Sequence, residues 1–323
     1  MTILRICLLA LLAICSHASA QEVPYPTRPV KVIVGYGPGG GTDIIARILA
    51  PAMAQEMGQP IIIENKPGAS GIIGAYALAK APPDGYTLMM GVVSLNALMP
   101  SLNSNLPYDT ARDLVPVTLT ASVPHFVAVN PSLPVKTLQE LITYAKAHPN
   151  ELSFPSAGNG TTPHIAGEIF MSLTGTHLLH VPYKSTGQSL PDLMSGMHKV
   201  SFDTYPTIAN LVRTGRLRAL AVTGAKRLPD FPDVPTAEEA GVKNFRISTW
   251  YGLFAPRGTR PSVIAYIHAK TAKALLSPST AANLKEAGVD GTVTHSPEEF
   301  ASLVQHDTER FARIIKAANI HLE

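Results

Sequence analysis

Two glycine-rich loops constrain the fold of this chain more than any other feature of its sequence. The first loop, residues 37–41, follows the apolar stretch 30–34 and precedes a run of Ile, Leu and Met at helical spacing. The second loop, residues 156–162, also lies between a predicted strand and a predicted helix, which begins at about Pro163. A chain that passes repeatedly from strand to helix through short turns is typical of an α/β fold with a parallel sheet.

The rest of the chain continues this alternation. Pro51 lies within the helix that follows the first loop, and we expect it to kink that helix or to end it early. The chain has 323 residues, of which 46% are hydrophobic, so it is long enough for two domains with packed cores. Further strands are predicted at 61–63, 87–93, 126–129, 178–181, 200–202, 217–222 and 248–255, and helices at 72–80, 138–148 and over most of the sequence from 261 onward.

The charge distribution argues against nucleic acid as a partner. The chain has 26 basic and 23 acidic residues, and only 15% of its residues are charged. It contains no basic block, whereas binding to a phosphate backbone requires a clustered cationic face. We therefore expect a small molecule and not a nucleic acid as the ligand.

Residues 1–20 are predicted to be a secretory signal peptide. A single basic residue precedes the apolar run 6–14, which is too short to span a bilayer. Small residues then lead to Ala20, so we expect cleavage after Ala20 and a soluble protein in the periplasm. Both cysteines, Cys7 and Cys15, lie in this segment. The mature protein would therefore have no disulfide, no thiolate nucleophile and no cysteine-bound metal.

The two glycine-rich loops predict sites for an anion. The N–H groups in the first turn of a helix have no partner within the helix and carry the positive end of its dipole. Glycines allow an anionic group to approach these N–H groups closely. In open α/β sheets, ligands bind beyond the carboxyl ends of the strands, where both loops are placed. The sequence thus predicts two uncharged anion sites made from main-chain donors.

Other chemistry is less favoured. Gly35, Gly37 and Gly40 match the spacing of the dinucleotide-binding fingerprint, but Pro38 interrupts it and an exported protein rarely meets NAD, so we predict no cofactor. The motifs H-E-x-x-H and G-x-S-x-G are absent from the sequence, which makes an exported enzyme the weaker alternative.

Histidine spacing gives no metal site either. His177 and His180 would point to opposite faces of a predicted strand, where they could not bind the same ion.

Two side chains near the loops have two interpretations each. Asp203, at the end of the predicted strand 200–202, could bind a ligand amine or hydroxyl, or it could cap the helix that follows. His164, in the first turn of the second loop's helix, could lie near the ligand or on the exposed helix surface.

A series of short motifs runs from about Tyr25 to Ile320. In order, they are Pro38 to Asp43, Ile63 to Ala69, Pro83 to Leu88, Gly158 to Thr161 with His164, Val181 to Lys184, Leu220 to Thr223, Asp233 to Thr236 and Tyr251 to Pro256. This series resembles the tripartite tricarboxylate transporter substrate-binding proteins, known as the Bug family of periplasmic solute receptors. Each motif alone is modest, but all of them in this order are specific for the family.

The resemblance implies a two-lobed α/β periplasmic binding protein of the type II kind. Each lobe would have a mainly parallel sheet flanked by helices, and two crossover strands would form the hinge. The first lobe would comprise residues 21–125 and 251–323, and the second lobe residues 126–250. The lobes would close around the ligand.

The resemblance also implies which residues contact the ligand, with no catalytic residue and no metal. In this family, loops of the first lobe hold a carboxylate, often through water, and the second lobe closes over it. The implied ligand-binding residues of the first lobe are Tyr36, Gly39, Gly40, Gly41, Thr42, Asp43, Ala69, Ser70 and Ser94. Those of the second lobe are Ser156, Gly158, Gly160, Thr161, Thr162, His164, Asp203 and Tyr205.

Some positions depart from the family's usual pattern. Gly35-Tyr36 stands where members usually have Pro and Phe, and Thr204-Tyr205 replaces Asn and an aliphatic residue after the strand-end aspartate. Ser185 stands where Gly commonly follows the Tyr–Lys pair. We expect these positions to affect the part of the ligand that is not the carboxylate.

The residues and the resemblance together lead to one expected function. We expect a monomeric periplasmic receptor that captures a small organic carboxylate and delivers it to a two-component integral membrane transporter. A receptor that presents its ligand to a sensor protein is the alternative, because both would use the same closed form.

Overall fold

The structure is a computed structural model and describes residues 25–289 and 294–317. The predicted signal peptide and both cysteines lie outside the described residues. Within the described part, no helix is long and apolar enough to cross a membrane.

The first lobe is built on a five-stranded sheet in the order β2-β1-β3-β10-β4. Strand β1 is parallel to β2 and β3, whereas β10 is antiparallel to β3 and β4. Strand β1 lies between β2 and β3, which suits its apolar sequence, since four of its five residues are buried. The strands are β1 (Val30–Val34), β2 (Ile61–Asn65), β3 (Thr87–Val92), β4 (Leu114–Pro124) and β10 (Ser248–Pro256).

The second lobe contains a three-stranded and a two-stranded sheet. Strand β5 (Phe126–Val129) lies between β8 (Val200–Ser201) and β9 (Arg218–Val222) and is antiparallel to both. Strand β6 (Ser153–Ser156) pairs with β7 (Leu179–Pro182) in parallel. The expected two-lobed α/β fold is confirmed, with β5 and β10 as the antiparallel strands. Each of these two strands enters its lobe from the other lobe, which explains the reversed direction.

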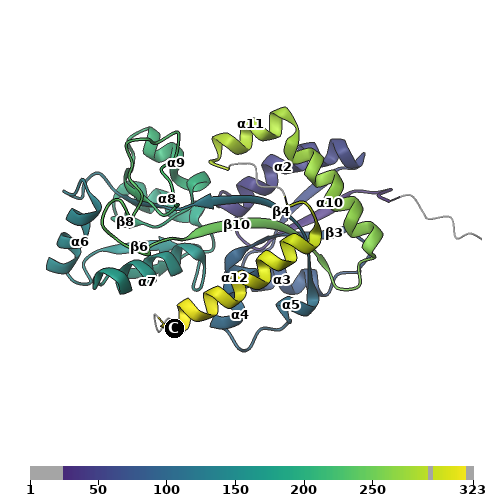
Figure 1. Cartoon of the computed structure of the whole chain (residues 1–323), viewed down its shortest axis with the longest axis horizontal. Helices are drawn as coiled ribbons and strands as arrows, with labels where there is room; N and C mark the ends of the chain where they lie inside the picture. Colours follow the sequence, from purple (N-terminus) through teal and green to yellow (C-terminus); the bar gives the residue numbers. More distant parts are fainter. Residues whose placement is uncertain (1–24, 290–293, 318–323) are drawn as a thin grey trace, which may run out of the picture.

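Two long strands connect the lobes. Strands β4 and β10 pair from Leu114 opposite Pro256 to Pro124 opposite Ser248. Figure 1 shows this pair running from one lobe into the other. A pair of connecting strands of this kind allows hinge closure of the lobes around a ligand. The residue boundaries of the lobes given above remain a prediction.

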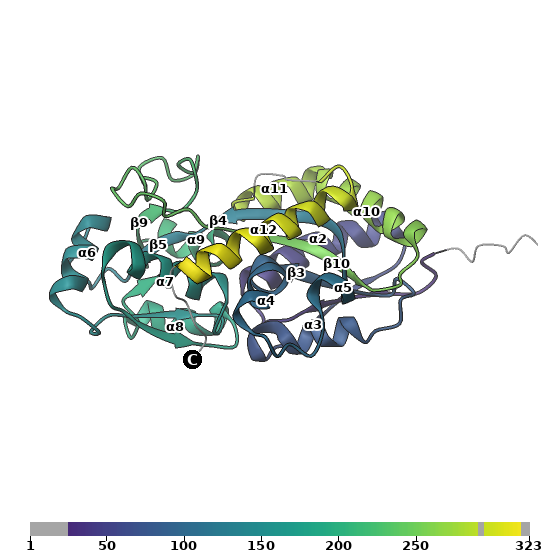
Figure 2. The ribbon, with the colours of Figure 1, turned by 60° about the horizontal axis from the view of Figure 1, so that its bottom comes forward.

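Helices flank the sheets of both lobes (Figures 1 and 2). The C-terminal helix α12 packs along β4. The helices of the first lobe include α2 (Gly41–Met57), α3 (Ile72–Ala79), α4 (Met99–Leu102), α5 (Thr110–Asp113), α10 (Pro261–Leu276), α11 (Pro278–Glu286) and α12 (Pro297–Ala317), with short 3₁₀ and π turns at Ala69–Gly71 and Ser94–Leu98. Those of the second lobe include α6 (Leu138–Ala147), α7 (Thr162–Thr174), α8 (Thr186–Ser195) and α9 (Tyr205–Arg213).

We expected Pro51 either to kink helix α2 or to end it early. The helix does not end at Pro51. The helix continues to Met57 and ends at Gly58, which is in the left-handed conformation. Pro51 itself is exposed, whereas Leu49 and Met53 on either side are buried in the core. Burial of this apolar face holds the helix together across the proline, which lacks the N–H of a normal helical residue.

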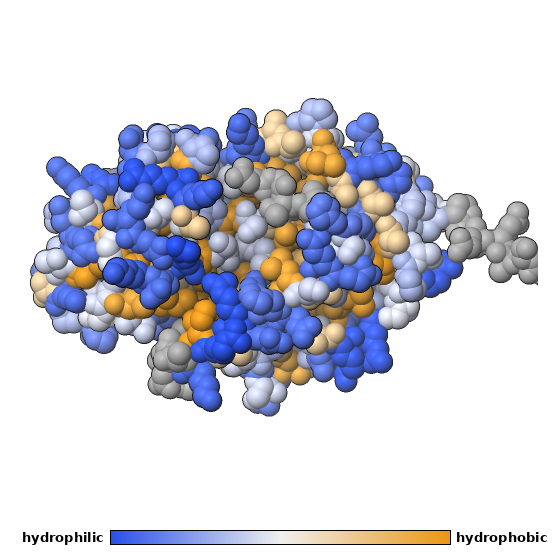
Figure 3. Space-filling view, viewed as in Figure 1, coloured by the Kyte–Doolittle hydropathy of each residue, from blue (hydrophilic) through white to orange (hydrophobic). Residues whose placement is uncertain are grey.

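The core extends from one lobe to the other along the connecting strands. Trp250 packs edge-on against Phe300 of α12, at 5.4 Å between ring centroids, and its indole N–H donates to Asp307 at 2.8 Å. The surface shown in Figure 3 is mostly hydrophilic, with separate small hydrophobic areas.

Candidate ligand-binding cleft

A small cavity lies between the lobes, where the helices α2 and α7 begin. It leaves about 40 Å³ of space, enough for a few water molecules. The lining comes from both lobes and consists of Tyr36, Gly40, Gly41, Thr42, Val92, Ser94, Ala157, Thr161, Thr162, Pro163, Ser185, Thr186, Asp203, Thr204, Thr249 and Tyr251. Among these described lining residues there is no Lys, Arg or His.

The start of α2 forms one wall of the cavity. Gly40 is the residue before the helix, and Gly41 and Thr42 form its first turn. Gly41 lies against the hydroxyl of the fully buried Tyr251, so that a Cβ atom at position 41 would collide with it. The glycine therefore lets the backbone, with its free first-turn N–H groups, reach the cavity.

Asp43 stabilises this loop from behind. Its carboxylate accepts hydrogen bonds from the N–H of Gly39 at 3.0 Å, from the Arg47 Nε at 3.0 Å and from the Asn65 amide at 2.9 Å. Burial opposes ionisation of this carboxyl group, but the hydrogen bonds outweigh it and lower the pKa of Asp43. The ion pair with Arg47 is thus internal to the loop and brings no net charge to the cavity.

The start of α7 forms the opposite wall. Thr162 accepts a hydrogen bond from the Thr249 hydroxyl at 2.8 Å, and Thr249 in turn contacts Nε2 of His125 at 2.7 Å. Pro163 occupies the second position of the helix and has no N–H, so the free donors of this turn come from its neighbours. These contacts fix α7 to the connecting strand β10.

A histidine pair holds the second glycine-rich loop from behind. Nδ1 of His164 accepts the N–H of Gly160 at 3.0 Å, and Ser156 bonds to Nε2 of His180 at 2.6 Å. The two imidazole rings stack with centroids 3.9 Å apart. Burial, followed by the proximity of His164, lowers the pKa of His180 to about 3. These groups shape the loop but do not line the cavity.

Asp203 is the one carboxylate among the described residues that line the cavity. It is buried, and its Oδ1 accepts the N–H of Thr204 at 2.6 Å. Burial raises the pKa of Asp203 to about 6, although hydrogen bonds from Thr204, Thr186 and Thr207 favour the ionised form. A buried carboxylate with hydroxyl partners and no cation is suited to accept a hydrogen bond or to meet a positive charge.

The lobes touch directly beside the cavity. The N–H of Gly37 donates to the carbonyl of Lys184 at 3.3 Å, and Ser185 Oγ donates to the carbonyl of Pro38 at 3.4 Å. Gly187, in the first turn of α8, faces the backbone of residues 38–39 so closely that a Cβ atom would lie 2.6 Å from the Pro38 oxygen. The structure therefore shows the lobes closed.

The structure brings part of the predicted site together at the cavity. The predicted residues that line it are Tyr36, Gly40, Gly41, Thr42, Ser94, Thr161, Thr162 and Asp203. The others lie behind the lining or beside it: Gly39, Asp43, Ala69, Ser70, Ser156, Gly158, Gly160, His164 and Tyr205. Contact with the ligand stays a prediction for both groups.

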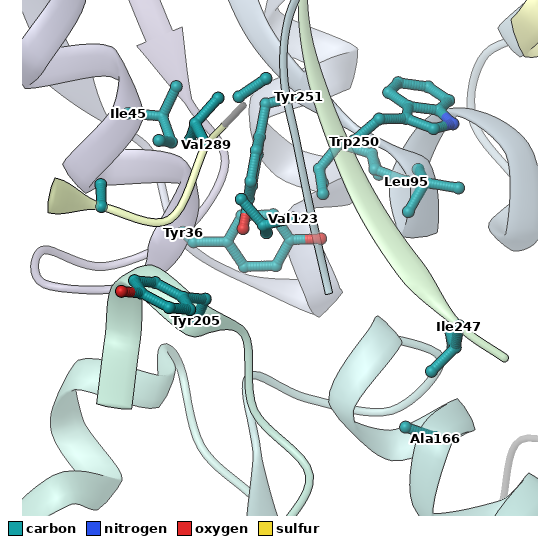
Figure 4. Packing of buried hydrophobic residues seen from close by; sticks show 14 of the residues in the cluster. Tyr36, Ile45, Leu95, Val123, Ala166, Tyr205, Ile247, Trp250, Tyr251 and Val289 are labelled. Atoms are coloured by element: carbon teal, nitrogen blue, oxygen red, sulfur yellow. The ribbon is translucent and has the colours of Figure 1, made fainter. Parts of the chain in front are cut away.

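Tyr205 was expected to contact the ligand, but it does not line the cavity. Its hydroxyl donates to Asp230 at 2.8 Å and accepts from Arg213 at 2.9 Å, and its ring packs on Gly288 of the other lobe. In Figure 4 the ring lies below Tyr36 and points its hydroxyl away from it.

Sequence reasoning missed several lining residues, among them Thr186, Thr204 and Tyr251. Two of them carried a usable signal. Tyr251 belongs to the motif from Tyr251 to Pro256, and Thr204 directly follows Asp203. Thr186 opens α8 and carried no such signal, because its place depends on how the lobes close.

Comparisons with known proteins show the family of this chain. The family described as "Tripartite tricarboxylate transporter family receptor" matches residues 45–320. This chain belongs to that family. It is 34% identical over 300 residues to Protein BugT from Bordetella pertussis, which covers 93% of this chain and 92% of that protein. The family consists of periplasmic solute-binding receptors and not of enzymes, and this assignment applies to the chain.

Two solved structures of the family contain ligands. Rpa4515 from R. palustris, solved with adipate, matches with a TM-score of 0.89 and 35% identity, covering 92% of this chain and 99% of that one. MatC from Rhodopseudomonas palustris, with bound malate, matches with a TM-score of 0.85 and 32% identity, covering 90% and 100%. The fold expected from the sequence is thereby confirmed.

Proposed function

We propose that this receptor captures a small organic carboxylate in the cavity between its lobes, with main-chain N–H groups of the two glycine-rich loops as the principal donors. The observation that carries the proposal is the lining itself. Residues at the start of α2 and α7 line the cavity, and the described lining side chains include no cation. The two solved relatives with adipate and malate bind ligands of the same chemical class.

Uncharged donors can hold such a ligand. The start of a helix carries roughly half a positive charge, and hydrogen bonds from N–H groups to an ionised acceptor contribute about 1.5–3 kcal/mol each. Two helix starts that face one cavity supply several such donors. Closure of the lobes then excludes water from them, which strengthens each contact.

A melting-temperature screen tests the proposal. We expect four- to six-carbon dicarboxylates to raise the Tm of the mature protein by about 5 °C or more at saturating concentration, because they bind only the folded state. The diesters of the same acids have no charge and should leave the Tm unchanged. Equal shifts with acids and diesters, or no shift with any carboxylate, would refute the proposal.

We further propose that the ligand offers a hydrogen-bond donor, an amine or a hydroxyl, to Asp203. The other titratable side chains that line the cavity are Tyr36 and Tyr251, and burial raises the pKa of both, so that they stay neutral near pH 7. Among the side chains that line the cavity, Asp203 is therefore the one whose charge changes near pH 7. An ionised Asp203 attracts an ammonium group and repels a second carboxylate.

The pH dependence of binding follows from this assignment. Between pH 5 and 7.5, the affinity for an aminodicarboxylate should rise about tenfold as Asp203 ionises, and the affinity for the plain dicarboxylate should fall. The variant Asp203→Asn should bind the aminodicarboxylate about 10- to 100-fold more weakly at pH 7.5 and show no such pH dependence. Calorimetric titration at both pH values measures this. If the pH dependence persists in Asp203→Asn, another group causes it and the assignment to Asp203 is wrong.

We also propose that the chain is exported by cleavage after Ala20 and that the closed, ligand-bound form delivers its ligand to a two-component membrane transporter. The family to which the chain belongs supports a transport partner. N-terminal sequencing of the periplasmic protein should begin at Gln21. Uptake of the labelled ligand should require both the receptor and the membrane components, whereas a sensor-linked receptor would leave uptake unchanged when deleted.

A further inference from the structure

One tyrosine hydroxyl at the cavity is not used by the contacts that hold the loops. Tyr251 lines the cavity from the connecting strand β10, and its side chain is 1% exposed. The other tyrosine of the lining, Tyr36, donates its hydroxyl proton to the carbonyl of Ser70 at 3.0 Å. Within the described part of the chain, no carbonyl or carboxylate oxygen accepts a hydrogen bond from the Tyr251 hydroxyl; outside the strand pairing, it is the main-chain oxygen of Tyr251 that is bonded, to Thr120 at 3.0 Å. Buried donors normally have a partner, so this proton is available to a ligand.

The Tyr251 hydroxyl lies where the two lobes meet. On the side of the first lobe, it is so close to Gly41 that a Cβ atom at position 41 would collide with it. On the side of the second lobe lies the hydroxyl of Thr204, at 3.0 Å from the same Cβ position. Figure 4 shows the Tyr251 ring extending from β10, with its hydroxyl toward the middle of the interface and near Tyr36. The hydroxyl therefore lies between the first turn of α2 and the second lobe.

The first turn of α2 has free N–H groups at the same place. The first hydrogen bond of the helix joins the N–H of Ile44 to the carbonyl of Gly40 at 3.0 Å, so the helix does not use the N–H groups of Gly41 and Thr42. A carboxylate has two oxygens and accepts about four hydrogen bonds. A carboxylate held by these N–H groups would thus have the Tyr251 hydroxyl beside it as a further donor.

The protonation state of Tyr251 suits this role. Burial raises the pKa of Tyr251, the hydroxyl of Thr204 opposes this shift, and the charge of the nearby Asp203 adds to it. The hydroxyl therefore keeps its proton over the whole range in which a carboxylic acid is ionised. A neutral donor of this kind binds a carboxylate without the cost of burying a second charge.

We propose that Tyr251 is a ligand-binding residue, whose hydroxyl donates a hydrogen bond to the carboxylate held by the first turn of α2. The inference rests on the proposed capture of a carboxylate in the cavity and adds one side-chain donor to the main-chain donors. Tyr251 pairs with Val92 of β3 and Ala121 of β4 in the sheet of the first lobe. The hydroxyl thus belongs to the lobe that holds the carboxylate and can contact it before the lobes close.

The conservative variant Tyr251→Phe keeps the ring and removes the hydroxyl. We expect an unchanged Tm without ligand and about 10- to 100-fold weaker binding of the tightest dicarboxylate from the melting-temperature screen, the loss expected for a hydrogen bond to an ionised acceptor. Tyr108→Phe is the matched control. Tyr108 is also buried and its hydroxyl has no partner among the described residues, but it does not line the cavity, so this variant should bind like the natural protein. Calorimetric titration gives the affinities.

A second variant displaces the same hydroxyl without changing Tyr251. In Gly41→Ala, the added Cβ takes the place of the hydroxyl and should weaken binding to a similar extent. In the double variant with Tyr251→Phe, the two losses should not add, because both remove the same hydrogen bond. Natural affinity in Tyr251→Phe, an equal loss in Tyr108→Phe, or fully additive losses in the double variant would overturn the inference. If the natural protein itself binds no carboxylate, the proposed function fails instead, so the two failures are distinguishable.

Discussion

Replacement of Gly187 by alanine is expected to leave both lobes folded and to weaken ligand binding about 100-fold or more, which corresponds to about 2.8 kcal/mol. In the closed structure, a Cβ at this position would lie 2.6 Å from the Pro38 oxygen and 2.8 Å from the Gly39 carbonyl carbon. Both atoms are backbone of the opposite lobe and cannot turn aside. The substitution therefore obstructs closure.

The same substitution should not harm the second lobe itself. The three nearest atoms to the added Cβ all belong to residues 38–39 of the first lobe. Gly187 lies in the first turn of α8, where alanine favours the helix over glycine. The Tm without ligand should thus stay the same or rise.

Gln188→Ala is the matched control, since Gln188 is the exposed neighbour of Gly187 in α8. It should bind like the natural protein. Calorimetric titration and small-angle X-ray scattering measure affinity and closure for both variants. Ligand-induced compaction and natural affinity in Gly187→Ala would show that binding does not need the closed arrangement.

The second large effect is expected from Thr42→Pro, which removes one main-chain donor from the cavity wall. Thr42 is the second residue of α2, where the helix does not use the N–H group. Loss of one hydrogen bond to a carboxylate should weaken binding by about 10- to 100-fold. The loss should be independent of ionic strength to first order, because the lost donor is uncharged.

The chain itself shows that a helix can begin in this way. Helices α7 and α9 carry Pro163 and Pro206 at their second positions. Thr42→Pro copies that arrangement into α2 and should preserve the helix, which circular dichroism checks. Thr42→Val removes the hydroxyl but keeps the N–H, and it should lose much less affinity. Equal losses in the two variants would mean that the side chain, and not the backbone, contacts the ligand.

The fold was predictable because its signals are local. The apolar run that became β1 and the glycine loop before α2 each specify their own structure. The two-lobed arrangement was expected from the family resemblance that the series of motifs carries. Pro51 shows the limit of a local rule. Its effect on α2 was overridden by the buried apolar residues on either side, which are placed by tertiary packing.

The candidate site was predictable most directly where the backbone forms it. Gly41 and Thr42 line the cavity because they begin a helix at the end of a strand, which the sequence shows. The direction in which a side chain points could not be predicted in the same way, because it depends on tertiary contacts. His164 turns back to hold the N–H of Gly160, and Tyr205 packs against Gly288, a residue far away in the sequence. Gly187 matters only when the lobes close, and no local pattern encodes that approach.

A crystal structure of the receptor with the tightest carboxylate from the Tm screen tests the central claim most directly. We predict that one carboxylate group lies within hydrogen-bonding distance, directly or through a single water, of the N–H groups of Gly41 and Thr42. An amine or hydroxyl group of the ligand should meet Asp203. A carboxylate paired instead with a lysine or arginine side chain, or bound outside the cleft, would contradict the account.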